Sequence, residues 1–273
     1  MQSEVYKMPG YKDWIEQADI KVDYYSAFMK AWIAFNAWYN FSGEIPLGTD
    51  RKCIEHIIEH TNRFKTYINN LLANTGTESD SFKSSLAKLH ESLLASSITS
   101  QEYFGVAQII SFAEVPIKNT NNLHQFDYYT YHYVCKREHG KLITIIQKLS
   151  DQSEVFRYEQ VGFDENELSQ QSSYNSLTIT QKQTVLSCYR RLIPYHRKNV
   201  LCIHPNPNNS NVIKIGNYDF IKDIEEISRA IITVLYMLRC CLAHGDFTPD
   251  ALSQNVYRYA YAVSYTHLTL PTT

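Results

Sequence analysis

Arg239 and His244, separated by four residues near the end of the chain, are the side chains best suited to chemistry. A histidine titrates near neutral pH, so it can move a proton to or from an oxygen of a phosphodiester. An arginine presents a planar fork of N–H donors that can stabilise the charge of a phosphorane. Together the two residue types could support proton transfer and charge stabilisation at a phosphate.

The pair stands at the end of a long predicted helix, and Gly245 is a typical residue just beyond a helix end. On a regular helix five residues turn the chain by about 500°, so the two side chains would point roughly 140° apart. They can meet only if the helix distorts near Gly245 or if a second subunit contributes, and the second case predicts a homodimer. The helix is predicted from apolar residues at steps of three and four, namely Ile221, Ile224, Ile227, Ile231, Leu235, Leu238 and Leu242.

A simpler interpretation of the pair needs no catalysis. A cation near the C-terminal end of a helix interacts favourably with the helix dipole, so Arg239 could cap the helix while His244 is an ordinary residue at its end. Because short motifs often match by chance, the spacing alone favours this simpler interpretation.

Two stretches of the chain resemble the HEPN superfamily of mostly bacterial ribonucleases and their inactive relatives. They read DWIEQADIKVDYYSAFMKAWIAFNAWYN near the start and NYDFIKDIEEISRAIITVLYMLRCCLAHGDF near the end. The second carries an Arg and a His followed by a Gly, as members of that superfamily do. The resemblance implies that Arg239 and His244 are the catalytic pair of an endoribonuclease that needs no metal or other cofactor and leaves a 2′,3′-cyclic phosphate.

The same resemblance implies an antiparallel helical bundle and a homodimer. It further implies a role in bacterial defence or stress response, with RNA as the substrate and an antitoxin or a nucleotidyltransferase among the candidate partners. Two positions depart from the pattern. Members of the superfamily commonly carry a polar residue just after the Arg, whereas Cys240 and Cys241 stand here. The alternative function is therefore a noncatalytic HEPN module that binds RNA or a partner protein.

Asn36 and Asp246 are assigned a supporting role beside the pair. Asn36 lies next to Trp32 and Tyr39 on a helix face that is otherwise apolar, and a buried amide must find hydrogen-bond partners. It could reach the site from a facing helix, or it could satisfy a local backbone group. Asp246 stands two residues after the His, where some toxin and antitoxin pairs carry a Tyr that becomes modified, and this argues against that regulation.

A second cluster could bind RNA. Cations and aromatic rings alternate in YRRLIPYHRKN, a mixture that suits single-stranded RNA. A helix end that faces water is the simpler interpretation. The formal net charge of −2 argues against a surface that binds polyanions everywhere. The candidate RNA-binding residues are Arg190, Arg191, Arg197 and Lys198.

One pattern imitates a metal site. His56, Glu59 and His60 spell H-x-x-E-H, in which two histidines share a helix face as in inverted zinc peptidases. Such enzymes need a third ligand from a supporting helix, and no downstream segment offers an obvious one. The polar face of an amphipathic helix explains the same letters, so we assign no metal ligand, and a zinc hydrolase is only a third alternative.

The composition is that of a soluble globular protein. Its 273 residues are 44% hydrophobic and 20% charged, which is enough for a sizeable core. The 6 cysteines are scattered without a CxxC pair, which fits reduced thiols. Neither a signal peptide nor an apolar run of about 20 residues is recognisable. We therefore expect a cytoplasmic protein that does not enter a membrane.

The patterning along the chain predicts a mainly α fold, an antiparallel HEPN-like helical bundle with a small β-rich insertion at about 116–216. Runs rich in Tyr, Ile and Val after Pro116 predict a strand meander, and VLCIH and NVIKIG predict two further strands. The other helices are expected at Val22–Tyr39, from about Asp50 to Leu72, and at 81–94, 99–113 and 180–192.

The last residues, Val263 to Thr273, read VSYTHLTLPTT and match one reading frame of a transposase adapter used in sequencing libraries. We therefore expect a single HEPN-like domain over residues 1–262 and a non-native tail over 263–273. A helix with Thr248 as its N-cap and Pro249 at its first position is expected to be cut near Ala262, so that the native chain would be longer.

Overall fold

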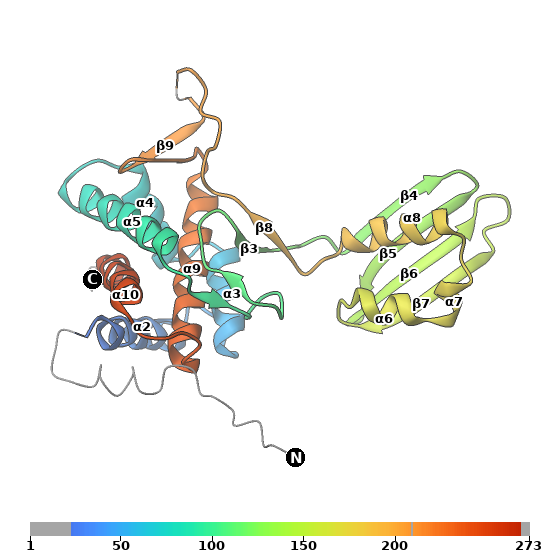
Figure 1. Ribbon diagram of the computed structural model, residues 1–273, viewed down its shortest axis with the longest axis horizontal. Coiled ribbons are helices and arrows are strands. Elements are labelled where there is room, and N and C mark those ends of the chain that lie inside the picture. The colour runs from blue at the N-terminus through green and yellow to red at the C-terminus, as the bar shows by residue number, and fades with distance from the viewer. Residues whose placement is uncertain (1–22, 209, 269–273) are drawn as a thin grey trace, which may run out of the picture. The chain divides into compact units, whose positions relative to one another are not determined.

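The computed structural model (Figure 1) describes residues 23–208 and 210–268 and divides the chain into two compact units. The helical unit comprises the described residues of Met1–Ile117 and Arg197–Thr273, and the β-rich unit comprises Lys118–His196. Taken together the structure is mixed α/β, with 48% helix and 21% strand. The expectation of a mainly α protein therefore fits the helical unit but not the whole chain.

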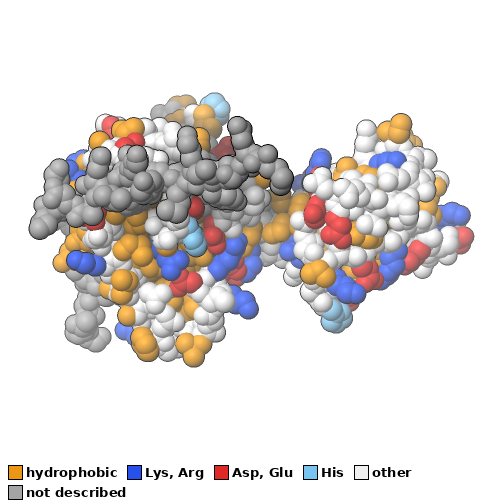
Figure 2. Space-filling view, turned by 60° about the horizontal axis from the view of Figure 1, so that its bottom comes forward, with side chains coloured by type: hydrophobic (Ala, Val, Ile, Leu, Met, Phe, Trp, Pro, Cys, Tyr) orange, Lys and Arg blue, Asp and Glu red, His pale blue; other side chains and the backbone are white. Residues whose placement is uncertain are grey.

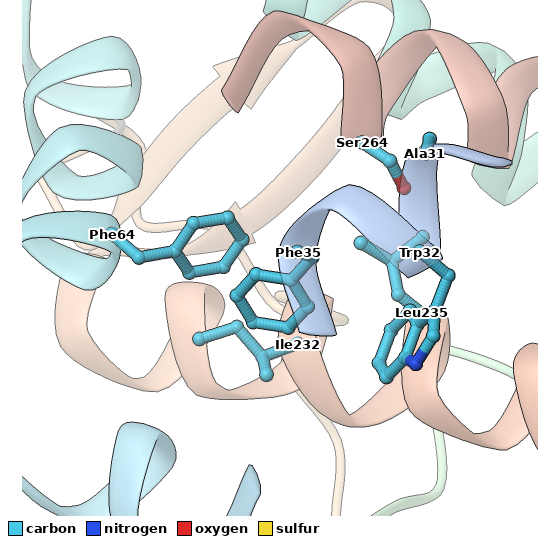
Figure 3. Close-up of a pocket in the computed structure, with 7 residues that line it drawn as sticks. All are labelled: Ala31, Trp32, Phe35, Phe64, Ile232, Leu235 and Ser264. Carbon is cyan, nitrogen blue, oxygen red and sulfur yellow. The ribbon is translucent and has the colours of Figure 1, made fainter. Parts of the chain in front are cut away.

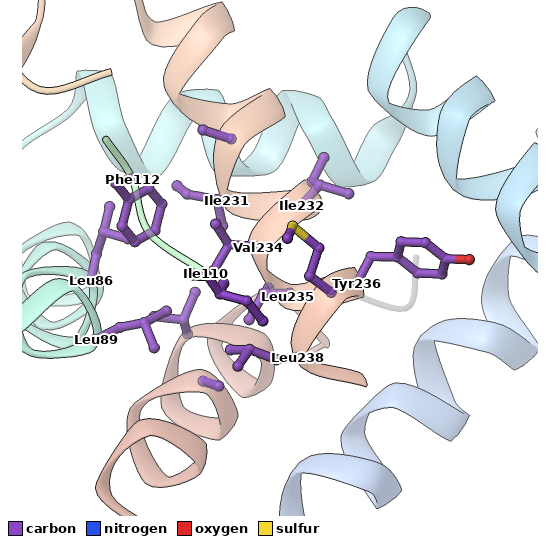
Figure 4. Close-up of a cluster of buried hydrophobic side chains, with 14 of the residues drawn as sticks. Leu86, Leu89, Ile110, Phe112, Ile231, Ile232, Val234, Leu235, Tyr236 and Leu238 are labelled. Carbon is purple, nitrogen blue, oxygen red and sulfur yellow. The ribbon is translucent and has the colours of Figure 1, made fainter. Parts of the chain in front are cut away.

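Helix α9 (Ile224–His244) is the core of the helical unit. Its apolar residues are buried almost all round, and Figure 4 shows Leu86 and Leu89 packed beside it with Phe112. By length and hydropathy α9 is the one described helix that could cross a membrane, but 72% of that window is buried, as a core helix requires. The other helices of this unit are α2 (Tyr24–Phe41), α3 (Asp50–Glu59), α4 (Arg63–Ala73), α5 (Thr77–Ala95) and α10 (Ala251–Leu268).

The apolar stripe that predicted the first helix is buried in α2, so this prediction is confirmed; Val22 lies outside the described residues. Asp23 caps the helix by accepting hydrogen bonds from the backbone N–H groups of Tyr25 and Ser26. The buried side chains of α2 are Tyr25, Phe28, Ala31, Trp32, Phe35 and Tyr39.

The second amphipathic run forms two helices, not one. It breaks between α3 and α4, where the Asn62 side chain accepts a hydrogen bond from Lys65 N at 2.9 Å and donates one to Ile57 O at 2.9 Å. An asparagine whose side chain bonds to backbone groups at the end of one helix and at the start of the next is favoured as a cap and disfavoured inside a helix. The continuous apolar period hid this break.

The prediction of a helix at 99–113 is wrong. Strand β1 (Thr99–Ser100) pairs with β2 (Gln108–Ile109) in a short antiparallel hairpin. The connecting segment contains Gly105 with a φ of +66°, in the left-handed region that a helix interior excludes. Ile110 N then donates to Ile98 O at 3.0 Å, which continues the pairing.

The chain turns sharply between α9 and α10. Gly245 has a φ of +68° and donates its N–H to Cys241 O, a common helix ending. Asp250, and not the expected Thr248, caps α10, because its Oδ1 accepts a hydrogen bond from Ser253 N at 2.6 Å. Helix α10 continues past Ala262, and Val263 is buried in the core. The non-native origin of residues 263–273 stays a prediction.

The β-rich unit contains the predicted meander. Its four strands pair in the order β4-β5-β6-β7, all antiparallel, and Figure 1 shows the helices α6, α7 and α8 on one face. Buried side chains such as Tyr133, Ile146 and Phe156 pack there against Val185 and Tyr189. The elements are β4 (Leu123–Tyr128), β5 (Tyr131–Glu138), β6 (Lys141–Lys148), β7 (Glu154–Val161), α6 (Glu165–Gln170), α7 (Ser172–Asn175) and α8 (Ile179–Arg190).

The β-rich unit is shorter than the insertion expected at 116–216. Strands β3 (Val115–Lys118) and β8 (Tyr195–Lys198) pair with each other. The hairpin of β9 (Val212–Ile215) and β10 (Tyr218–Ile221) belongs to the helical unit, where Ile215 and Phe220 are fully buried. Of VLCIH only Leu201 forms a bridge, to Phe220.

Candidate functional site

Arg239 is held near the end of α9 by a carboxylate from another helix. Its Nη2 lies 2.8 Å from Oδ2 of Asp50, the first residue of α3. The two side chains are 25% and 26% exposed, so the pair is fixed by packing and still borders on water. A guanidinium has five N–H donors, so this ion pair does not occupy all of them, but the Nε of Arg239 is buried and cannot contact an anion from solution.

Asp50 is the centre of a hydrogen-bond network. Its Oδ1 accepts hydrogen bonds from Asn36 Nδ2 at 3.0 Å and from the Tyr39 hydroxyl. Asn36 Nδ2 lies 2.6 Å from Tyr39 OH, and its Oδ1 accepts from Asn40 Nδ2 at 2.7 Å. Burial and the hydrogen bond to Asp50 raise the pKa of Tyr39 well above its usual range, so the hydroxyl remains a donor.

The network connects the predicted residue Asn36 to Arg239 through Asp50, a residue that the sequence did not predict. Asn36 donates a hydrogen bond to Asp50, and Asp50 forms the ion pair with Arg239. Asn36 is therefore connected to Arg239 through the Asp50 carboxylate. Asp50 was not predicted, because an acidic residue in the first turn of a helix is already explained by the helix dipole. A long-range pair carries no local sequence signal.

A second set of polar contacts adjoins Arg239 along α9. The Tyr236 hydroxyl lies 3.3 Å from Glu102 Oε1, and Arg51 Nη1 donates to the Glu102 carbonyl at 2.9 Å. The Arg51 guanidinium also lies over the Tyr103 ring, 4.8 Å from its centroid. These polar contacts join α9 to the loop between β1 and β2, and Tyr236 itself is buried.

His244 is the last residue of α9 and is exposed. Among the described residues its side chain has no hydrogen bond or ion pair, and the backbone N–H of the exposed Asp246 donates to Cys241 O at 3.0 Å. Since α9 stays α-helical through His244, the distortion that could have turned this side chain toward Arg239 is absent within α9. The two side chains therefore point roughly 140° apart in one chain.

Cys240 and Cys241 are packing residues. The Cys241 thiol donates to Thr99 O at 3.1 Å, and burial together with the nearby Asp246 raises its pKa to about 12. Burial also raises the pKa of Cys240, and the Glu102 carboxylate adds to that effect. Both thiols therefore stay protonated at neutral pH and face the core, so they contribute no charge to a site.

The four cations proposed to bind RNA are divided between the units. Arg190 and the exposed Arg191 belong to the β-rich unit, where Arg190 Nη2 lies 2.7 Å from Glu165 Oε2. Arg197 and the exposed Lys198 belong to the helical unit, where Arg197 pairs with Glu114 at 3.3 Å. Figure 2 shows basic and acidic side chains next to one another on both units, with no broad patch of one sign on that face.

The H-x-x-E-H pattern has another explanation. The rings of His56 and His60 stack 4.1 Å apart at the end of α3, and His60 Nδ1 lies 3.2 Å from His56 O. In the part of the chain that the structure describes, no group of three or more His, Cys, Asp or Glu residues could hold a metal ion. The pattern therefore belongs to a helix end.

Beneath α2 the helical unit has one narrow apolar cavity near this site. Figure 3 shows Phe35 and Phe64 side by side at one end of it and Trp32 with Leu235 at the other. Its volume of about 10 Å³ admits no more than a water molecule. This cavity is therefore too small to hold a substrate.

Comparison of the chain with family models, with curated proteins and with solved structures gave no match. The relation to the HEPN superfamily therefore rests on the two stretches quoted above and stays a prediction.

Proposed function

We propose that this chain is a HEPN-like endoribonuclease that cleaves RNA without a metal, as a cytoplasmic homodimer in bacterial defence or stress response. The observation that carries the proposal is the ion pair between Arg239 and Asp50. It fixes a partly exposed guanidinium at the end of the helix that also carries His244. A cation held in place before the substrate arrives is what stabilisation of a phosphorane needs.

The proposed reaction is an intramolecular transesterification. Neutral His244 takes the proton of a ribose 2′-hydroxyl, and the 2′-oxygen forms a bond to phosphorus. The bond from phosphorus to the 5′-oxygen breaks, and the leaving oxygen receives a proton from a histidinium or from water. The products are a 2′,3′-cyclic phosphate and a 5′-hydroxyl. Arg239 stabilises the negative charge on the phosphoryl oxygens in between.

A second copy of the chain completes the site in this proposal. Arg239 and His244 point apart on one regular helix, and both side chains have exposed surface. A twofold arrangement that brings the ends of two α9 helices together would place Arg239 of one copy near His244 of the other. The dimer would then contain two equivalent sites.

Cleavage of a mixed-sequence RNA in EDTA, with the product ends identified, tests the enzyme. We expect cleavage by the wild type and a loss of about 10²-fold or more in Arg239→Ala and in His244→Ala. Arg63→Ala and His204→Ala are matched controls, because both side chains are exposed and lie on other elements. Equal activity in all four variants would show that a contaminant cleaves the RNA.

Mixing the two inactive variants tests whether the site is shared. In a heterodimer of Arg239→Ala with His244→Ala, one of the two shared sites keeps both residues. Random exchange of subunits should therefore restore about a quarter of the wild-type activity. Activity that stays at the level of the separate variants, although the subunits exchange, would place both residues of a site in one chain.

A second candidate, a noncatalytic module that binds RNA or a partner protein, is favoured by two observations. Asp50 neutralises Arg239, and no described residue orients the His244 ring. A wild type that is folded and dimeric, yet fails to cleave any RNA offered, would favour this function. RNA binding by the same protein, weakened in Arg239→Ala, would then distinguish an RNA partner from a protein partner.

A further inference from the structure

The β-rich unit contains a cleft that the proposed function does not use. It lies at the end of the sheet where β5 turns into β6, beside the residues that follow β7, and its volume is about 160 Å³. Its charged lining residues are Arg137 and Lys141, and no Asp or Glu lines it. The charged side chains that line the cleft are therefore both cations, of which Lys141 is paired with Glu159, although the chain as a whole has a slight negative charge.

Arg137 is a partly buried cation that has no counterion among the described residues. Its Nη2 donates to the backbone carbonyl of Leu192, but its Nε is buried and has no hydrogen-bond partner in this part of the chain. Among the described residues it has no ion pair, whereas Arg157 pairs with Glu154 and Glu159, and Arg190 pairs with Glu165. Burial lowers the pKa of Arg137, as expected for a charge that is left without compensation.

Such a cation is expensive to keep in a fold. A charge taken out of water is normally paired, and one without a counterion destabilises the fold unless water or an anion compensates it. Leu192 O offers only a partial charge. An anion bound in the cleft would supply the missing negative charge and accept from the donors that the carbonyl leaves unused.

The walls of the cleft leave room for an anion. Gly140 and Gly162 have φ values of +77° and +85°, so both need glycine, and a Cβ built at either one meets nothing within 4 Å. Backbone without side chains therefore borders the open space. The Phe163 ring, stacked on Tyr189 with centroids 4.5 Å apart, forms a rigid apolar wall.

We infer that this cleft binds a small anion that carries a phosphoryl group. The Arg137 guanidinium contacts the phosphoryl oxygens, and Lys141, which lies 3.1 Å from Glu159, supplies a second positive charge. Sites for larger organic ligands usually measure about 300 to 1,000 Å³, so this cleft suits inorganic phosphate or a phosphate ester whose organic part rests on Phe163. The inference goes beyond the proposed function and does not depend on it.

Isothermal titration of the full chain in phosphate-free buffer tests the inference, with inorganic phosphate, adenosine monophosphate and adenosine as probes. We expect saturable binding of phosphate that sulfate competes for. Arg137→Gln should weaken it about tenfold or more, because a charge-assisted hydrogen bond is lost. Arg157→Gln is the matched control, since it removes an arginine that already has carboxylate partners on the same sheet.

The three probes separate the sources of the phosphoryl group. If adenosine monophosphate binds more tightly than phosphate, the ligand is a phosphate ester whose organic part contacts Phe163. If the two bind equally, the ligand is inorganic phosphate. Adenosine that binds as tightly as its monophosphate would overturn the inference, as would no binding of any probe or equal affinity in Arg137→Gln and the wild type.

Arg137 also ties the segment after α8 to the sheet, so Arg137→Gln could unfold the unit. In that case Lys141→Gln, whose side chain is exposed, decides the matter, because it removes a charge from the cleft without removing the bond to Leu192 O. A loss of phosphate affinity of about threefold or more in Lys141→Gln supports the inference. Unchanged affinity in that variant would overturn it.

Discussion

Nη2 of Arg239 and Oδ2 of Asp50 lie 2.8 Å apart and join the end of α9 to the start of α3. The same carboxylate accepts hydrogen bonds from Asn36 and Tyr39 on α2, so one acidic side chain links three helices. Removal of that carboxylate would leave three donors without their acceptor, whereas removal of Asn36 would leave the ion pair in place.

Asp50→Ala should therefore lower the free energy of unfolding by about 1 to 3 kcal/mol, measured by urea titration, because donors in contact with the core lose a charged acceptor. Glu91→Ala on the exposed side of α5 is the control and should change it by less than about 0.5 kcal/mol. If the chain is a ribonuclease, Asp50→Ala should also lower cleavage about 10²-fold through a misplaced Arg239. A variant as stable as the control would show that the network contributes nothing to the fold.

His90 should make the fold sensitive to mild acid. Its ring is buried against Tyr218 at 4.4 Å, and its Nδ1 has no hydrogen-bond partner among the described residues. Burial lowers its pKa from the ordinary 6.5, so the unfolded chain binds more protons just below that pH. The free energy of unfolding should fall as the pH drops below about 6.5.

Urea unfolding of the wild type and of His90→Phe at about pH 7.5 and about pH 5.5 measures the contribution of this histidine. The wild type should lose more stability between the two values than the variant. His56, whose pKa is also lowered by burial, adds a dependence of the same sign in both proteins. Identical slopes in the two proteins would mean that His90 is protonated in the fold without cost.

Gly216, in the turn between β9 and β10, should not tolerate a side chain. Its φ is +60°, and a Cβ there would lie 2.6 Å from the Cβ of Ala87 on α5. Gly216→Ala should lower the free energy of unfolding by about 2 to 4 kcal/mol, the sum of backbone strain and overpacking. Gly43→Ala, with a φ of +74° and nothing near its Cβ, isolates the strain. The double variant Gly216→Ala with Ala87→Gly should regain only the part of the free energy of unfolding that is lost through overpacking. If it regains the whole loss, backbone strain at Gly216 makes no contribution.

The cysteines should react with a thiol reagent in a fixed order. Cys202 is partly exposed, whereas the other five are buried. Burial raises the pKa of Cys241 to about 12, so almost none of it is thiolate at neutral pH. Timed alkylation of the native chain followed by mass spectrometry should label Cys202 first and Cys240 and Cys241 only after unfolding. Early labelling of Cys240 would mean that the end of α9 opens in the native state.

The sequence predicts those elements whose burial follows a single period. Helices α2 and α9 and the four strands of the meander were predicted because one face, or nearly every face, is apolar at the period of the element. The failures occur where single residues override the period. The segment 99–113, which contains Gly105 with a φ of +66°, forms a short hairpin and not the expected helix. Asn62 breaks one apolar run into two helices, and Asp250 caps α10 two residues after the expected Thr248.

The candidate site could be predicted only in part, for a related reason. Arg239 and His244 stand close together in the sequence, so a motif can reveal them. Asp50 and Arg137 act through contacts with residues far away in the chain, or through the lack of such contacts. Neither a partner on another helix nor a missing counterion leaves a pattern in the neighbouring residues.

The ion pair of Arg239 joins two residues that are made at very different times during synthesis of the chain. Asp50 leaves the ribosome early, with Asn36 and Tyr39 already made, whereas Arg239 follows only after the whole β-rich unit has been translated. Until then Asp50, Asn36 and Tyr39 are present without Arg239, and α9, the centre of the core, has not yet been made. Any activity that requires Arg239 and His244 is thus withheld from the nascent chain until α9 has been made.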